Sequence, residues 1–245
     1  MPHHYDIDHI FEDWPYQPGV VSARLLRAHD GRDIVQMRTE LGLLQMEIEG
    51  RPDGERPNGS GTLLDALMAD AAAAGKQFML DEDQCFELDR EFLQFYHRRI
   101  CWLALREFAR AIADADHTLA MMDFGATHAT DPQWMLLHEQ YRPFVLFHRT
   151  QAAALLQLQT ATPEEAIDEI DAGLARIRSL YEQLEAAGHY EEDELVEQLV
   201  HLRESLREEY HVGRTLGEQL TDAIAAEQYE RAALLRDQIR HRPRL

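Results

Sequence analysis

The pattern of apolar and polar positions divides the chain into three regions, and the first, residues 1–59, is typical of β-structure rather than helix. Strand-forming residues fill Val20–Ala28 and Asp33–Leu41, and the Asp30-Gly31 pair between them is a strong hairpin signal. Apolar and polar residues then alternate along Leu44–Glu49, as a strand with one buried face requires. We therefore expect a small antiparallel sheet of about three strands in residues 1–59.

A Gly- and Pro-rich segment, Gly50–Gly61, follows the expected sheet. Its composition is that of an exposed connector between sheet and helices. An alternative is that its backbone N–H groups, with Arg51 and Arg56, hold an anion.

The apolar period becomes helical in residues 60–190, which we expect to form an α-helical body. Asp131-Pro132 and Thr162-Pro163 each place a capping side chain before a proline, as helix starts do. Pro143 is expected to bend or interrupt the first of these helices, and Gly188 to end the second.

Residues 191–245 read as a charged helix to about Val212, a break near Gly213 and a terminal pair of short helices. Leucines recur at helical spacing along the charged helix, while its other faces are rich in Glu and Arg. The fold class we expect is mainly α with a small N-terminal β-sheet, α+β overall.

The charge balance bears on partners and location. The 24 Lys and Arg against 45 Asp and Glu give a formal net charge of −21, which argues against direct binding to a phosphate backbone. No stretch approaches the roughly 20 apolar residues of a membrane span. The spacing of Cys85 and Cys101 suggests neither a disulfide framework nor a zinc site. We expect a cytoplasmic protein with no membrane association.

The most specific pattern lies in residues 217–241. Ala223 is followed by an acidic residue, an aromatic residue and Glu at 227–230, then an Ala pair and Leu-Arg-Asp-x-Ile. In order and spacing these positions resemble the UVR motif, a helical hairpin of UvrB and UvrC that also occurs in Clp-type ATPases and in the activator of protein-arginine kinase. Ile224 departs from it, because many members carry a second Ala there. The candidate partner-binding residues are Leu220, Ala223, Tyr229, Glu230, Ala232, Ala233, Leu235, Arg236, Asp237 and Ile239.

The physical chemistry of this segment agrees with the resemblance. Small residues let two helices approach closely, while Leu220, Tyr229, Leu235 and Ile239 supply an apolar seam. Glu227 and Arg231 are spaced as an i,i+4 ion pair. Helices this short are marginal alone, so the seam must be covered. The resemblance implies a protein partner, either UvrB/UvrC-like, a Clp-system protein or a second copy; the alternative is packing on the charged helix of the same chain.

A second resemblance concerns the helical body. Trp102–Leu119 is similar to the turn and second helix of a tetratricopeptide repeat, and Ala153-Ala154 with Pro163–Leu174 is similar to another. Ala111 and Ala166 are farther apart than the period of about 34 residues in a regular array. We therefore expect a degenerate, tetratricopeptide-like pair of helical hairpins, with a peptide-binding repeat protein as the alternative.

The histidines of the body raise a third possibility, a metal-binding helical-bundle enzyme. His97, His117, His138 and His148 lie among many carboxylates, but the Glu-x-x-His pattern of such bundles does not occur. Phosphate loops and nucleophile elbows are also missing from the sequence. We expect no metal, no cofactor and no catalytic residue. The function that the sequence favours is that of a non-enzymatic adaptor or scaffold, linked to nucleotide-excision repair or to Clp-type proteolysis.

Overall fold

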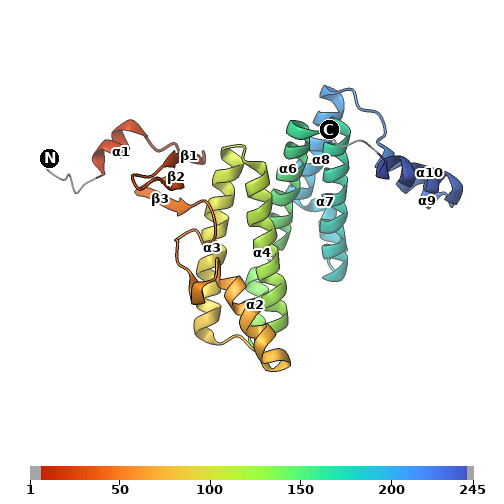
Figure 1. The fold of residues 1–245 in the computed structure, drawn as a ribbon. Coiled ribbons are helices and arrows are strands. Elements are labelled where there is room, and N and C mark those ends of the chain that lie inside the picture. Colours follow the sequence, from red (N-terminus) through yellow and green to blue (C-terminus); the bar gives the residue numbers. More distant parts are fainter. Residues whose placement is uncertain (1–6, 242–245) are drawn as a thin grey trace. The chain divides into compact units, whose positions relative to one another are not determined.

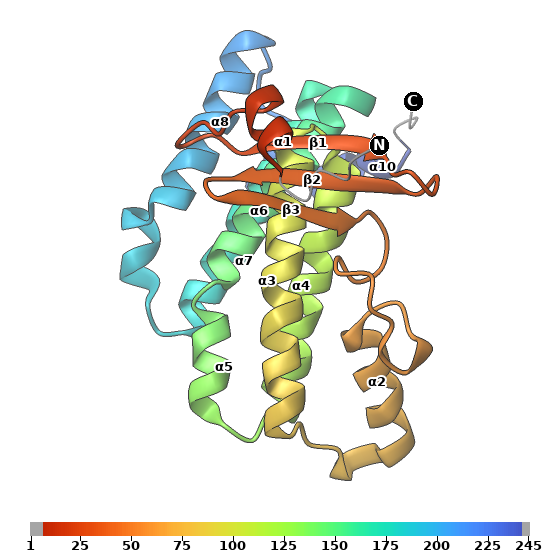
Figure 2. The ribbon, with the colours of Figure 1, turned by 90° about the vertical axis from the view of Figure 1, so that its left-hand side faces the viewer.

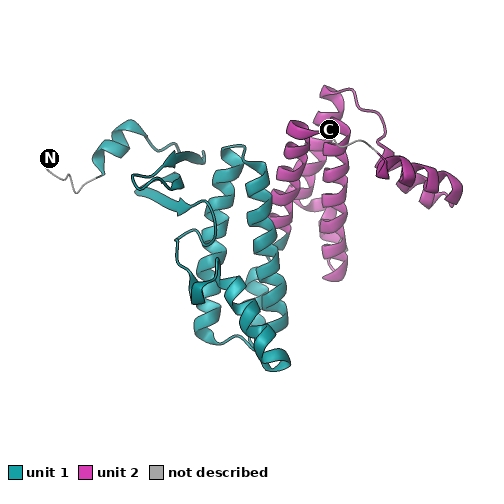
Figure 3. Ribbon diagram, in the orientation of Figure 1, with its two compact units in different colours: residues 1–142 teal, residues 143–245 magenta. Residues whose placement is uncertain are grey.

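The computed structural model describes residues 7–241, which fall into two compact units divided between Arg142 and Pro143 and called units 1 and 2 (Figure 3). This division differs from the three regions expected from the sequence, with boundaries near 59 and 190. The difference arises because the N-terminal sheet contacts a helix of the body and joins its unit. The helices that begin at the 142–143 boundary instead share a core with the charged helix near the C-terminus.

The predicted sheet is confirmed. It consists of β1 (Ser22–Arg27), β2 (Asp33–Thr39) and β3 (Gly42–Glu47), antiparallel in the order β1-β2-β3. The Asp30-Gly31 turn joins β1 to β2, and Gly31 has a φ of 88°, which glycine adopts without strain. With its helical remainder, the protein has the expected fold class, mainly α with a small N-terminal sheet (Figure 1).

One helix in the first region was not expected. Helix α1 spans Asp8–Asp13, and its ends carry no side-chain cap. The Phe11 ring lies 4.2 Å from the Arg38 guanidinium, and the Trp14 ring 4.4 Å from that of Arg24. These contacts with β1 and β2 stabilise a helix that local sequence alone does not predict.

Unit 1 continues with α2 (Leu63–Ala74), α3 (Glu82–Ala104), α4 (Phe108–His128) and α5 (Pro132–Glu139), and has short 3₁₀ turns at Pro57–Gly59 and Gly75–Gln77. The long helices α3 and α4 lie side by side, with α2 near one end (Figures 1 and 2). The predicted cap at Asp131 is confirmed, because its side chain accepts a hydrogen bond from the Gln133 N–H. The turn inside the first repeat-like stretch falls between α3 and α4.

Helix α3 carries charged residues inside this unit. Glu91 is fully buried, and its carboxylate accepts hydrogen bonds from the Leu63 and Leu64 N–H groups at the start of α2, at 2.7 and 3.2 Å. The His117 ring nitrogen Nε2 lies 2.9 Å from the same carboxylate. The helix dipole and these donors compensate a negative charge that would otherwise be costly to bury.

A buried arginine on α3 fixes the end of the sheet. Arg98 forms a two-pronged ion pair with Asp114 of α4, at 2.7 and 2.9 Å. Its third nitrogen donates to the carbonyls of Glu47 and Gly50, where β3 passes into the Gly50–Gly61 segment. The sheet is thus attached to α3 and α4 by charge-assisted hydrogen bonds.

The Gly50–Gly61 segment is also tied to α3, which bears on the anion alternative. Arg51 is only 2% exposed, and its guanidinium faces Asp53, Glu87 and Glu91 at 3.2, 2.9 and 3.7 Å. These carboxylates occupy its charge, so Arg51 is not available to an anion and the segment is more than an exposed connector.

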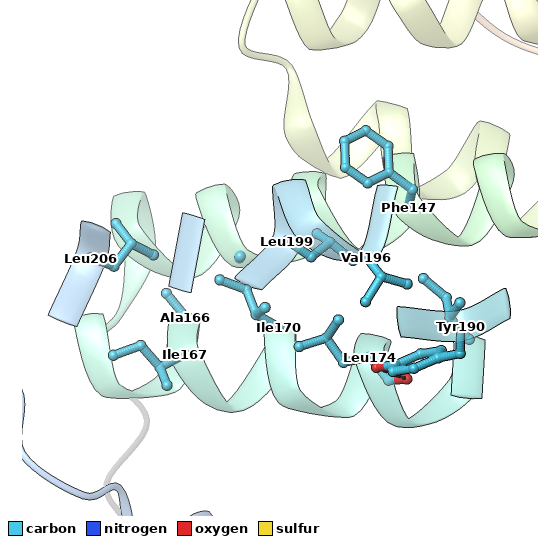
Figure 4. Close-up of a cluster of buried hydrophobic side chains, with 11 residues drawn as sticks. Phe147, Ala166, Ile167, Ile170, Leu174, Tyr190, Val196, Leu199 and Leu206 are labelled. Carbon is cyan, nitrogen blue, oxygen red and sulfur yellow. Dashed lines mark hydrogen bonds between the residues drawn. The ribbon is translucent and has the colours of Figure 1, made fainter. Parts of the chain in front are cut away.

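Unit 2 contains α6 (Arg142–Thr160), α7 (Pro163–Gln183), a 3₁₀ segment (Ala187–Glu192), α8 (Glu194–Glu209), α9 (Leu216–Ala225) and α10 (Tyr229–Arg240). Apolar side chains of α7 and α8 meet in a core that also receives Phe147 of α6 (Figure 4). Gly173 of α7 lies against Thr150 of α6 so closely that a Cβ there would stand 2.1 Å from Thr150 Oγ1. The α6–α7 crossing therefore depends on glycine.

Two predicted helix signals in this part of the chain have different outcomes. The Thr162 cap is confirmed as a capping box with Glu165. The expected helix end at Gly188 is wrong, because α7 stops at Gln183 and the chain turns at Glu185, a non-glycine residue with a φ of 54°. Glycine marks a common way to end a helix, and this helix ends without it.

No helix in the described part of the chain is long and apolar enough to cross a membrane.

Candidate protein-interaction site

Helices α9 and α10 form the terminal hairpin that the sequence predicts. Thr215 caps α9 by accepting a hydrogen bond from the Glu218 N–H, and the Glu218 carboxylate accepts from the Thr215 N–H in return. The chain reverses at Glu227, which has a φ of 56°, and α10 begins at Tyr229. The expected Glu227–Arg231 helix pair is therefore wrong, since Glu227 lies in the turn and Arg231 bonds to Gln228 instead.

Part of the predicted site faces inward and holds the hairpin together. Ala223, Ala232 and Leu235 are buried between α9 and α10, with the half-buried Leu216 and Leu220 packed against them. The two alanines allow the close approach of the helices that the sequence indicated. These side chains are already covered within the chain, so their role is to maintain the hairpin.

The prediction that Tyr229 and Ile239 lie in the seam is wrong, because both face outward. Tyr229 is 68% exposed and Ile239 is 39% exposed. Sequence reasoning missed two apolar neighbours on the hairpin, Ile224 and Leu234, which are 55% and 66% exposed. A signal was present for Leu234, because adjacent helical residues point about 100° apart, and with Leu235 buried Leu234 must turn away from the seam.

The polar members of the predicted site also lie on the surface. Glu230, Arg236 and Asp237 are exposed, and Arg236 pairs with its neighbour Asp237 at 3.0 Å. Ala233 is half-buried. Among the exposed side chains of the hairpin, we call the following set its exposed face: Ile224, Tyr229, Glu230, Leu234, Arg236, Asp237 and Ile239. This face combines aliphatic and aromatic side chains with charges of both signs, the composition of many protein-binding surfaces.

The hairpin is attached to the rest of unit 2 at the start of α9. The Thr215 hydroxyl donates a hydrogen bond of 2.5 Å to Asp168 of α7, and Glu218 pairs with Arg207 of α8 at 2.6 Å. A Cβ at Gly217 would stand 2.7 Å from the Asp168 carboxylate, so α9 and α7 approach closely here.

The pKa values of the two acidic residues at this joint, Asp168 and Glu218, are shifted in opposite directions. Burial raises the pKa of Asp168, the Thr215 hydrogen bond lowers it, and the nearby Asp171, Glu218 and Glu165 raise it, with a net upward direction. Burial also raises the pKa of Glu218, but the Thr215 N–H and the charge of Arg207 outweigh it and lower that pKa overall. At this joint the ionised form of Glu218 is therefore stabilised, whereas the ionised form of Asp168 is destabilised.

The hairpin packs on its own chain only in part. Its first turn is fixed to α7 and α8 by the Thr215 and Glu218 contacts. Its two helices otherwise pack chiefly on each other. The side chains of Ile224, Tyr229 and Leu234 remain exposed, so packing within the chain leaves an apolar surface free.

Two of the four histidines considered for a metal site, His117 and His138, contact carboxylates of helix α3. His117 contacts Glu91, and His138 lies 3.0 Å from Asp89 while its other ring nitrogen faces the Trp134 carbonyl. Burial lowers the pKa of His97. Between residues 7 and 241, no three His, Cys, Asp or Glu side chains are grouped to hold a metal ion.

Comparison with known proteins adds one finding. Residues 214–241 match the family model of the UvrB/uvrC motif, UVR. This motif is known from UvrB, UvrC and Clp-type proteins and mediates protein interactions. Neither the curated proteins nor the solved structures contain a match to the chain. The matched residues are those that fold into the α9–α10 hairpin, and the chain is therefore a UVR domain-containing protein.

Proposed function

We propose that the protein is a non-enzymatic adaptor of the cytoplasm that docks on a partner protein through the exposed face of its UVR hairpin. Helices α7 and α8 of unit 2 hold the start of this hairpin. No step of the proposed function requires a cofactor.

One observation carries the proposal: the hairpin fills its own seam and still exposes Ile224, Tyr229 and Leu234. Exposed apolar side chains on so small an element favour a partner surface, because their transfer from water drives association. Tyrosine is among the residues that contribute most to binding at interfaces. Tyr229 is the residue we expect to contribute most.

The partner that this surface fits is a protein rather than a nucleic acid, since the net charge of −21 repels phosphate backbones. UvrB/UvrC-like proteins of excision repair and Clp-system proteins remain the candidate classes, together with self-association. The exposed face can pair with another short helical element, which would cover its apolar residues.

Affinity capture with the full chain, and with a chain lacking residues 217–245, tests the proposal. Removal of the hairpin should abolish recovery of the specific partners in quantitative mass spectrometry. Circular dichroism should show that the truncated chain keeps its other helices. Recovery of the same partners after truncation would exclude the hairpin as the docking element.

A second candidate function, peptide binding by the helical body, is favoured by a groove along α7 and α8. The groove has a volume of about 680 Å³ and is lined by apolar, aromatic and charged side chains, among them Leu174, Tyr190 and Val200. Grooves with apolar side chains at their base can bind the apolar face of a helical peptide. The tetratricopeptide-like character expected for residues 60–190, which include α7 but not α8, remains part of this proposal.

A further inference from the structure

The α7–α8 groove has an apolar floor. Leu174 of α7 and Val196 of α8 form its base with Tyr190, and the small Ala175 and half-buried Val200 border it. Ala175 is exposed, so nothing larger than a methyl group obstructs the groove at this point. A partner side chain placed here would meet carbon atoms from both helices.

The rim of the groove is acidic, and its arginines are already engaged. The Arg178 guanidinium lies over the Tyr190 ring at 4.4 Å, and Arg203 lies between Asp171 at 2.7 Å and Glu204 at 2.8 Å. Both cations therefore have partners within the groove wall.

Three carboxylates of the rim have no such partner. The exposed Glu182, Glu191 and Glu197 line the groove, and no cation of the described chain pairs with them. The surrounding sequence strengthens their field, since 15 acidic and 4 basic side chains lie between Pro163 and Glu209. A groove that gathers charge of one sign attracts ligands of the other.

We infer that the α7–α8 groove binds a basic amphipathic helix of a partner protein. Its apolar side chains would lie on the floor at Leu174, Ala175 and Val200, and its Lys or Arg side chains would reach Glu182 and Glu197 on the rim. An amphipathic helix presents these two chemistries on adjacent faces at matching spacing. This inference rests on the second candidate function and does not depend on the UVR hairpin.

The test uses the full chain and three labelled peptides that share one Ala/Leu amphipathic helix but carry Lys, Gln or Glu on the polar face. Fluorescence anisotropy measures their binding at low and high salt. The Lys peptide should bind most tightly, and its affinity should fall as salt screens the rim. The Glu peptide should not bind.

Variants locate the binding. Glu182→Gln with Glu197→Gln should weaken the Lys peptide about threefold to tenfold. Ala175→Trp should block all peptides by filling the groove. The control, Glu208→Gln with Glu209→Gln, makes the same charge change at exposed positions of α8 outside the groove and should have little effect.

The outcomes separate the proposals. If the Lys and Gln peptides bind equally and both lose binding in Ala175→Trp, the groove binds peptides but the inference of a basic partner helix fails. If the control variant weakens binding of the Lys peptide as much as Glu182→Gln with Glu197→Gln, the peptide is attracted by the overall negative charge of the protein. The α7–α8 groove is then not its binding site. No binding of any peptide would overturn the second candidate function itself. If Ala175→Trp converts a self-associated chain to monomer in sedimentation, the occupant is a second copy and the inference fails.

Discussion

The Thr215 hydroxyl joins the UVR hairpin to α7 by donating a 2.5 Å hydrogen bond to the Asp168 carboxylate. The same oxygen accepts the Glu218 N–H and so caps α9. Thr215 is 1% exposed, which places both bonds away from water. One side chain therefore both starts the hairpin and sets its attachment to the body.

The first prediction concerns this joint. Thr215→Val keeps the shape of the side chain but removes the cap and leaves Asp168 without its donor, at a cost of about 1–3 kcal/mol. Amide hydrogen exchange should accelerate in α9 and α10 while α3 and α4 remain protected. Thr221→Val, which removes an exposed hydroxyl from the same helix, is the control and should leave exchange unchanged.

The raised pKa of Asp168 predicts a pH dependence of stability. Because this carboxyl binds its proton more tightly in the folded protein than in the unfolded chain, its ionisation opposes folding at neutral pH. That penalty disappears as the pH falls through the folded pKa toward the unfolded value. The stability of Asp168→Asn relative to the native chain should therefore be most favourable near neutral pH and decline on acidification.

Urea unfolding of both proteins across the acidic range measures this difference. Glu209→Gln, at an exposed position on α8, serves as the matched carboxylate-to-amide control. A stability difference between Asp168→Asn and the native chain that stays constant with pH would refute the proposed role of Asp168 ionisation.

The third prediction concerns the buried carboxylate of unit 1. Glu91→Gln removes the negative charge that faces Arg51, His117 and the start of α2. Loss of one partner from such a buried network typically costs about 3–5 kcal/mol. Denaturant unfolding should show this loss, whereas Asp83→Asn in the exposed first turn of α3 should change stability little. Equal stability of the two variants would mean that Glu91 is not needed for the fold.

The fourth prediction tests the α6–α7 crossing. Gly173→Ala places a methyl group against Thr150 and should destabilise unit 2 by about 1–3 kcal/mol, despite a gain of up to about 1 kcal/mol from replacing a helical glycine. Adding Thr150→Ala should restore part of the thermal stability by removing Oγ1 and Cγ2. Gly188→Ala, where no atom lies within 4 Å, is the control. A melting temperature unchanged by Gly173→Ala would show that the crossing can widen freely.

Local signals predicted much of the fold. The Asp30-Gly31 turn, the alternation in β3 and the caps at Asp131 and Thr162 depend on neighbouring residues only, and each is confirmed. The hairpin was expected from the resemblance of residues 217–241 to the UVR motif, and α9 and α10 confirm it. At these places the local preference of the sequence agrees with the final fold.

Features that depend on distant residues could not be predicted. Helix α1 is held by Arg24 and Arg38, and Glu91 is buried because α2 and His117 supply its donors. In the site, the sequence placed Leu235 correctly in the seam, but it also placed Tyr229 and Ile239 there, and both are exposed. The attachment of Thr215 to Asp168, 47 residues earlier, left no local pattern at all.

The central claim is that the exposed face of the hairpin docks on a partner, and two sets of variants test it most directly. Tyr229→Asp with Leu234→Asp alters only outward-facing residues, while Leu41→Asp with Leu184→Asp places the same two charges at exposed leucines outside the hairpin. Affinity capture should lose its partners with the first variant and keep them with the second, at equal helix content by circular dichroism. Retention of the same partners by Tyr229→Asp with Leu234→Asp would contradict the account.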